Sequence, residues 1–161
     1  MPNKTVHDEL KIEAQKLAAA SASATEFMER LALLLHERML KYNWVGFYLI
    51  EDSIARAELV LGPFRGAMTP HTRIPMHQGI CGAAASTGKT VVVDDVGKDP
   101  RYLACSLETK SEIVAPVFVR GNVVGELDID SHFPAAFGGA DRDLVEYCAS
   151  LAGQCFEKSA R

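Results

Sequence analysis

The chain contains four cysteines, and their surroundings divide them into two pairs. Cys81 lies in a Gly-Ile-Cys-Gly run at the expected start of a short helix, and a helix N-terminus lowers the pKa of a thiol. Cys105 lies in a long segment between two expected strands, where a cysteine is less often part of the core than in a helix. Cys148 and Cys155 are seven residues apart on one side of an expected helix, which favours packing. We therefore expect any reactive thiols at Cys105 and Cys81, although each could instead be a buried structural residue.

Three acidic residues alternate with apolar ones in the last expected strand. Glu126, Asp128 and Asp130 are separated by Leu127 and Ile129. Because successive side chains of a strand point to opposite faces, the three acids share one face. That face is either solvated, or it lines a site from which water is excluded, where repulsion raises the pKa of the carboxyl groups.

A fourth acid, Glu112, begins the preceding expected strand, and the hairpin register decides whether it joins the other three. A two-residue turn at 121–122 would pair position 112 with 131 and point Glu112 away from the aspartates. A three-residue loop at 120–122 would pair Glu112 directly with Asp130 on one face. The sequence leaves both registers open.

A cleft that holds Cys105 and several acids has a definite chemical use. A thiolate attacks an electrophile, and a protonated carboxylic acid donates to the oxygen that leaves. Ionised carboxylates hold an ammonium group, and Trp44 and Tyr48, which share strand parity, could form an apolar or cation-π wall. The aromatic residues could equally be part of a core strand. Phe47 faces the other way.

The sequence predicts no metal site. His71, His77 and Cys81 are spaced by six and four residues, Pro75 interrupts any helix between them, and the histidines are otherwise scattered. The pair Cys81 and Cys105 has no zinc or thioredoxin spacing.

The elements that must position these residues follow from hydrophobic periodicity. Helices are expected at 8–20, from Glu26 (with Thr25 as N-cap) to about Leu40, at 79–86 with Gly88 at its end, and at 141–156. Strands are expected at 44–50, 58–61, 72–75, 90–93, 111–119 and 123–130, with breakers at 62–66 ending the second. Consecutive strand pairs predict an α+β fold, with a largely antiparallel central sheet flanked by helices.

Composition places the chain in a broad class. Its 161 residues fit one globular domain, and its net charge of −4 argues against a nucleic-acid partner. No stretch approaches the ~20 apolar residues of a membrane span, and the N-terminus has no secretory signal. We therefore expect a cytoplasmic protein with reduced thiols and no membrane partner.

Seven short blocks of the chain resemble the GAF-domain free methionine-(R)-sulfoxide reductases. They occur in the family's order over about residues 25 to 155: Asn43-Trp44-Val45-Gly46-Phe47-Tyr48, Leu59-Val60-Leu61-Gly62-Pro63-Phe64, Arg73-Ile74-Pro75, Gly79-Ile80-Cys81-Gly82, Ala104-Cys105, Ser111-Glu112-Ile113-Val114 and Leu127-Asp128-Ile129-Asp130-Ser131. The resemblance implies a GAF-like domain over residues 25–158, with residues 1–24 as an N-terminal extension, and a ligand pocket covered by loops.

The resemblance also implies a reaction and the residues that perform it. Free methionine-(R)-sulfoxide would be reduced to methionine without a bound cofactor, with thioredoxin as electron donor and partner. Cys105 matches the family's catalytic cysteine, and Glu112, Asp128 and Asp130 match its pocket carboxylates, with Glu112 or Asp130 assisting protonation. Trp44 and Tyr48 match the pocket aromatics. Members of the family often form homodimers.

One position departs from many members of the family. They have a cysteine ten positions before the one that matches Cys81, and this chain has His71 there. Cys81 is therefore the candidate resolving thiol. Direct reduction of oxidised Cys105 by thioredoxin or glutathione is the alternative, and a non-catalytic GAF domain that binds a small molecule as a sensor is the rival function.

Overall fold

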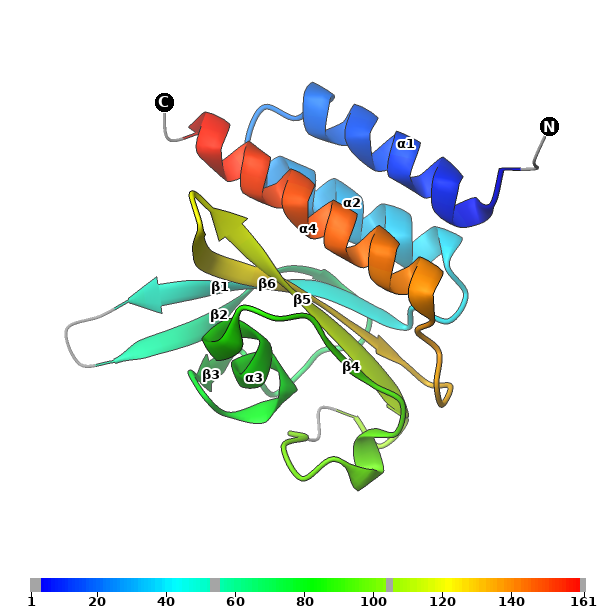
Figure 1. Ribbon diagram of the computed structural model, residues 1–161, viewed down its shortest axis with the longest axis vertical. Coiled ribbons are helices and arrows are strands. Elements are labelled where there is room, and N and C mark those ends of the chain that lie inside the picture. The colour runs from blue at the N-terminus through cyan, green and yellow to red at the C-terminus, as the bar shows by residue number, and fades with distance from the viewer. Residues whose placement is uncertain (1–3, 53–55, 104–105, 160–161) are drawn as a thin grey trace.

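The computed structural model describes residues 4–52, 56–103 and 106–159, so the predicted nucleophile Cys105 lies outside the described residues. Within these ranges the chain alternates helices and strands in the order expected for an α+β protein (Figure 1). The elements are α1 (Val6–Ala20), α2 (Ala24–Arg38), β1 (Trp44–Asp52), β2 (Ala57–Arg65), β3 (Arg73–Pro75), α3 (Gly79–Thr87), β4 (Val91–Val93), the 3₁₀ helix η1 (Val96–Lys98), β5 (Ser111–Val119), β6 (Asn122–Ser131) and α4 (Gly139–Ser159).

The strands form one antiparallel sheet in the order β3-β2-β1-β6-β5-β4. Figure 1 shows α1, α2 and α4 on one face of this sheet and α3 on the other. The face under the three long helices carries the main core, in which Phe27, Leu31, Leu144 and Cys148 are fully buried. The smaller face, under α3 and the loops, is where side chains of β1, β5 and β6 are available for a site.

α1 and α2 begin where side chains satisfy the first free backbone N–H groups. Thr5 and Asp8 form a reciprocal capping box at α1. The hydroxyl of Ser23 accepts a hydrogen bond from the backbone N–H of Glu26, so α2 begins at Ala24 and the predicted cap at Thr25 is wrong by two residues. α3 ends at Thr87 and is capped by Gly88, whose φ of 69° is left-handed, in agreement with the prediction that this glycine ends the helix.

β2 is longer than the sequence predicted. It continues through Gly62 and Pro63 to Arg65, although these residues were expected to end the strand. β3 pairs only with Glu58 to Val60, so Pro63 lies beyond the β2–β3 pairs, where the missing N–H of proline interrupts no ladder with β3. The extension keeps β2 paired with β1 as far as Val45.

The β5–β6 hairpin turns at 120–121, so neither the two-residue turn expected at 121–122 nor the three-residue loop at 120–122 is present. Val119 pairs with Asn122 across a two-residue turn, in which Arg120 and Gly121 both have positive φ. An irregularity between Val117 and Phe118 then shifts the register by one residue. As a result Glu112 pairs with Asp130, which is the pairing expected from a three-residue loop.

None of the helices in the described ranges is long and apolar enough to cross a membrane. All of the described cysteines are buried and unpaired, namely Cys81, Cys148 and Cys155. The packing role predicted for Cys148 and Cys155 is consistent with their places in the main core.

Candidate functional site

The candidate site lies on the sheet face beneath α3 and the adjoining loops. Strand pairing sets Trp44 of β1, Asp130 of β6 and Glu112 of β5 in one row across the sheet. Two residues along β6, Asp128 lies between Gly46 and Val114. Gly46 leaves room there because a Cβ at this position would lie 2.3 Å from the Trp44 ring. The register therefore brings together the aromatic side chain of Trp44 from β1, one acid from β5 and two acids from β6.

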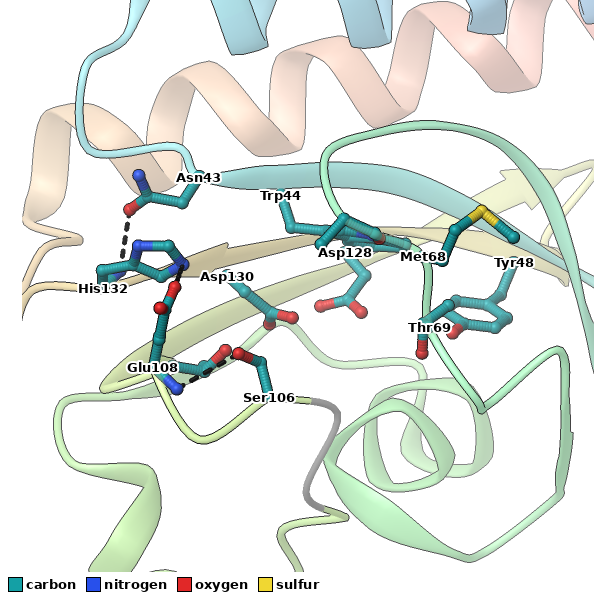
Figure 2. A pocket seen from close by; sticks show the side chains of 12 residues that line it. Asn43, Trp44, Tyr48, Met68, Thr69, Ser106, Glu108, Asp128, Asp130 and His132 are labelled. Atoms are coloured by element: carbon teal, nitrogen blue, oxygen red, sulfur yellow. Dashed lines mark hydrogen bonds and ion pairs between the residues drawn. The ribbon is translucent and has the colours of Figure 1, made fainter.

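A pocket of about 100 Å³ opens on this face. Figure 2 shows the carboxyl groups of Asp128 and Asp130 pointing from β6 toward it, with Met68 and Thr69 on the loop at its far side. The residues that line it are Asn43, Trp44, Tyr48, Ala67, Met68, Thr69, Ser106, Glu108, Thr109, Asp128, Asp130 and His132.

A second cavity, of about 20 Å³, lies beside the first and shares two of its walls, Tyr48 and Asp128. Cys81 and Glu112 line only this smaller space. Its remaining walls are Ile74, Gly79, Ile80 and Leu103. Asp128 therefore stands between the open pocket and an inner chamber that holds the Cys81 thiol.

The three predicted carboxylates are buried without a cation. Glu112, Asp128 and Asp130 are 3–5% exposed, and among the described residues no lysine, arginine or histidine forms an ion pair with them. Burial raises the pKa of Glu112 well above its usual value, and the nearby Asp128 and Asp130 raise it further. Burial also raises the pKa of Asp130, with a second contribution from Asp128. The water-excluded alternative for this strand face is therefore the one the structure adopts.

The surroundings of Cys81 raise the pKa of its thiol, whereas the sequence predicted that they would lower it. Its thiol is buried and lies 3.4 Å from Oδ2 of Asp128, to which it donates a hydrogen bond. Burial raises its pKa well above the usual value, and the carboxyl groups of Asp128, Glu126 and Glu112 raise it further. The prediction that the start of α3 lowers this pKa is wrong, because burial and three nearby acids outweigh the helix N-terminus.

Trp44 and Tyr48 form one wall and also hold the loop that covers the pocket. Their rings stack with centroids 6.2 Å apart. The indole Nε1–H of Trp44 donates to the carbonyl of Ala67 at 3.0 Å, and the Tyr48 hydroxyl donates to the carbonyl of His71 at 2.7 Å. The two aromatic residues thus fix both ends of the segment 67–71. Phe47 lies in the main core on the other face, as predicted from its parity.

Loop residues at the pocket rim were missed by the sequence analysis. His132 lies where its backbone N–H donates to Asn43 Oδ1 at 2.7 Å, and its ring Nε2 is 3.5 Å from Glu108 Oε2. Thr69 and Thr109 complete this rim. Loops have no hydrophobic periodicity, so the only sequence signal for Asn43 and His132 is that they lie next to the ends of β1 and β6.

The histidines considered for a metal site do not join Cys81. Among the described residues, the acidic and thiol side chains that come closest to a metal-binding arrangement are Cys81, Glu112 and Asp128.

Leu103 and Ser106, the described residues next to the undescribed segment 104–105, line the inner chamber and the open pocket respectively.

Comparison with known proteins places this site in a family. The GAF domain family matches residues 23–156. The crystal structure of the free methionine-R-sulfoxide reductase of Neisseria meningitidis, in complex with its substrate, superposes with a TM-score of 0.90 at 34% identity, covering 99% of this chain and 95% of that one. A Staphylococcus aureus fRMsr, also in complex with substrate, superposes with a TM-score of 0.85 at 33% identity, covering 97% and 99%.

A curated relative agrees with the structural matches. The free methionine-R-sulfoxide reductase of Escherichia coli is 41% identical over 116 residues, which are 70% of this chain and 67% of the relative. The chain therefore belongs to the GAF-domain family and, within it, to the free methionine-R-sulfoxide reductases.

Proposed function

We propose that this protein reduces free methionine-R-sulfoxide to methionine, with Cys105 as the nucleophile. The observation that carries the proposal is a pocket in which Asp128 and Asp130, buried and without an ion-pair partner in the described part of the chain, face the same space as Trp44 and Tyr48. Burial raises the pKa of both acids, and the ammonium group of a free amino acid would favour their ionised form again. A methionine residue within a protein has an amide in its place, so the pocket should favour the free amino acid.

Asp128, Asp130, Trp44 and Tyr48 line the pocket, whereas Glu112 lines the adjoining smaller cavity, and its role is proposed from the resemblance to the family. Asp128 binds the ammonium group, and Trp44 and Tyr48 contact the apolar part of the substrate. Glu112 or Asp130 donates a proton to the sulfoxide oxygen. Cys105 precedes Ser106, which lines the same pocket.

The reaction is balanced as an exchange of one oxygen atom. The Cys105 thiolate attacks the sulfoxide sulfur and forms a sulfur–sulfur bond, while the carboxylic acid gives its proton to the oxygen. The hydroxyl group then passes to the Cys105 sulfur, as the sulfur–sulfur bond and the sulfur–oxygen bond of the substrate break. The substrate sulfur gains two electrons and leaves as a thioether, while Cys105 loses two and becomes a sulfenic acid. A second thiol then displaces water to form a disulfide. No bound prosthetic group is needed.

The second thiol is assigned to Cys81, with direct reduction of Cys105 by thioredoxin or glutathione as the alternative. Cys81 lies in the inner chamber beside Asp128, which also lines the pocket. Its buried thiol, in an acidic setting, would react slowly until a base accepts its proton. If the Cys81→Ser variant recycles through thioredoxin at the wild-type rate, Cys81 is not the resolving thiol.

Further parts of the proposal rest on the resemblance to this family. We expect thioredoxin, itself reduced through NADPH, as electron donor and partner, and a homodimer in solution, which light scattering would test. The reduced thiols fit a cytoplasmic location. We also expect residues 25–158 to form the GAF domain, with residues 1–24 as an extension that packs on it through Leu10 and Ala14 of α1.

One coupled assay tests the activity. The reduced protein is incubated with free methionine-R-sulfoxide, thioredoxin, thioredoxin reductase and NADPH, and NADPH loss is followed. We expect turnover with the R epimer and little with the S epimer. Cys105→Ser should abolish methionine formation in a single turnover, whereas Cys155→Ala, a control thiol in the main core, should retain it. Binding of the R epimer without turnover would contradict the reductase and support the sensor function.

A further inference from the structure

Three ligand-type side chains converge in the inner chamber from three different elements. Cys81 comes from α3, Glu112 from β5 and Asp128 from β6. The thiol sulfur and one carboxylate oxygen from each acid all lie within 4.8 Å of one another. Atoms this close could contact a single ion after small side-chain rotations, because metal–ligand bonds of about 2.0–2.3 Å place neighbouring ligands within 4 Å.

The chamber has the size that such an ion needs. Its volume of about 20 Å³ exceeds the roughly 10–15 Å³ required to hold one water molecule. Ile74, Ile80 and Leu103 add apolar surface to its walls. Because Cys81, Glu112 and Asp128 are themselves buried, their attraction to a cation would be stronger than at an exposed site.

Unsatisfied oxygens at the same place provide an independent indication. Oδ1 of Asp128 is buried and has no hydrogen-bond partner among the described residues. Glu126, which is fully buried and interacts with Cys81, has neither carboxylate oxygen hydrogen-bonded within the described part of the chain. Buried polar atoms are nearly always paired, so an arrangement with several unpaired acidic oxygens is suited to a positive ligand.

We propose that Cys81, Glu112 and Asp128 form a binding site for a divalent thiophilic cation, with zinc as the reference ion. Zinc is bound by cysteine thiolates and by aspartate and glutamate oxygens, and a tetrahedral site with three protein ligands leaves the fourth position to water. Magnesium and calcium prefer oxygen ligands alone, so the thiol selects against them. Glu126 interacts with Cys81 but is not one of the three clustered ligands.

The site escaped the sequence analysis because its ligands are far apart in the chain. Position 81 precedes positions 112 and 128 by 31 and 47 residues in the chain, and no spacing motif joins the three. The sequence-based expectation of no metal site rested on histidine spacing, which this cluster does not use.

Occupation would affect the proposed reductase, and this consequence rests on the proposed function. An ion bound to Asp128 would compete with the substrate ammonium group, and an ion bound to Cys81 would block its role as resolving thiol. Zinc should therefore inhibit competitively with free methionine-R-sulfoxide.

Binding itself is tested without activity. Equilibrium dialysis of the reduced full chain against zinc, with metal analysis of the protein, should give one tightly held ion per chain. Cys81→Ala and Glu112→Gln should each weaken this binding roughly tenfold or more, because even residues that only support ligands cost 10–100-fold. Cys105→Ala and Cys155→Ala are the thiol controls and should retain the ion.

Two further readouts distinguish a folded site from adventitious binding. Cobalt substituted for zinc should show a thiolate charge-transfer band in the wild type that is absent from Cys81→Ala. Zinc should raise the unfolding temperature of the wild type but not of Cys81→Ala, and unliganded melting curves report whether each variant folds.

Unchanged zinc binding in Cys81→Ala, or loss of binding only in Cys105→Ala, would overturn the proposal. Tight zinc binding in a protein that shows no turnover would contradict the reductase and leave the metal site standing. Turnover without zinc binding would contradict the metal site and leave the reductase standing.

Discussion

At the scale of single residues, the site is defined by acids that are buried where their charge is costly. Glu112, Asp128 and Asp130 have no cation partner among the described residues, and Glu126 has no hydrogen-bond partner there either. Such groups destabilise the unliganded fold, since removing a carboxylate from water costs several kcal/mol unless it is paired or protonated. A ligand that brings positive charge would offset this cost.

Asp130→Asn should lower kcat/KM for free methionine-R-sulfoxide by about 10–100-fold. The amide keeps the shape of the side chain but loses the charge and the acidic proton, and a hydrogen bond to a charged group is worth about 1.5–3 kcal/mol. Steady-state kinetics measure the change. Asp143→Asn, on the exposed side of α4, is the matched control and should behave as wild type. Equal activity of both variants would exclude Asp130 from the site.

Glu126→Met should stabilise the unliganded protein by about 1–3 kcal/mol. Methionine fills a similar volume and removes a fully buried carboxyl group that has no hydrogen bond in the described structure. Thermal or urea unfolding measures the gain. Glu29→Met, on the exposed surface of α2, is the control and should leave stability almost unchanged. Destabilisation by Glu126→Met would mean that this carboxyl group has a partner.

At the scale of elements, the β5–β6 hairpin decides which side chains meet. A turn with positive φ at Arg120 and Gly121 starts the pairing, and an irregularity after Val117 shifts it by one residue. The shift turns Glu112 to the same face as Asp130, because a strand slip of one residue exchanges its two faces. The geometry of a remote turn therefore contributes directly to the composition of the site.

Gly121→Ala should destabilise the protein by about 1 kcal/mol. The φ of 80° is left-handed, where a Cβ costs about 1–2 kcal/mol, although no atom lies within 4 Å of the position that the Cβ would occupy. Gly139→Ala, at the start of α4, is the matched control because its surroundings are equally open and its φ is not left-handed. Chemical denaturation compares the two, and equal losses would show that the turn conformation is not the cause.

At the scale of the whole molecule, one polar cluster ties three segments together away from the site. Asp141 of α4 accepts hydrogen bonds from the hydroxyl of Tyr42, at 2.6 Å, and from the backbone of Gly138, and it lies 2.9 Å from the ring of His7 on α1. These contacts hold α1 and the α2–β1 connection against α4. Burial alone would raise the pKa of Asp141, but the hydrogen bonds outweigh it and the pKa is lowered.

Asp141 should make stability depend on pH in the acid range. Because its pKa is lower folded than unfolded, its contribution is complete above the unfolded value of about 3.9 and is lost as the pH falls through the folded value. Unfolding curves from pH 7 to pH 3 should therefore show a steeper loss for the wild type than for Asp141→Asn. Parallel pH profiles for the two proteins would contradict the assignment.

The sequence by itself determined the local features of the site. Alternation placed Asp128 and Asp130 on one face of β6, and strand parity separated Trp44 and Tyr48 from Phe47, because these patterns depend only on the two-residue repeat of a strand. Paired strands between helices also predicted the α+β fold. The cap of α2 and the end of β2 were misplaced, since hydrogen bonds to neighbouring residues decide such boundaries.

Only the tertiary structure decided which face is dry, how β5 and β6 align, and that Cys81 lies against Asp128. Each of these depends on contacts between segments distant in the chain, for which local sequence carries no signal. The helix N-terminus predicted a reactive Cys81 thiol, and the acids delivered by two other elements reversed that expectation. Charge in a buried site is set by all the groups that fold around it, and therefore cannot be predicted from one segment alone.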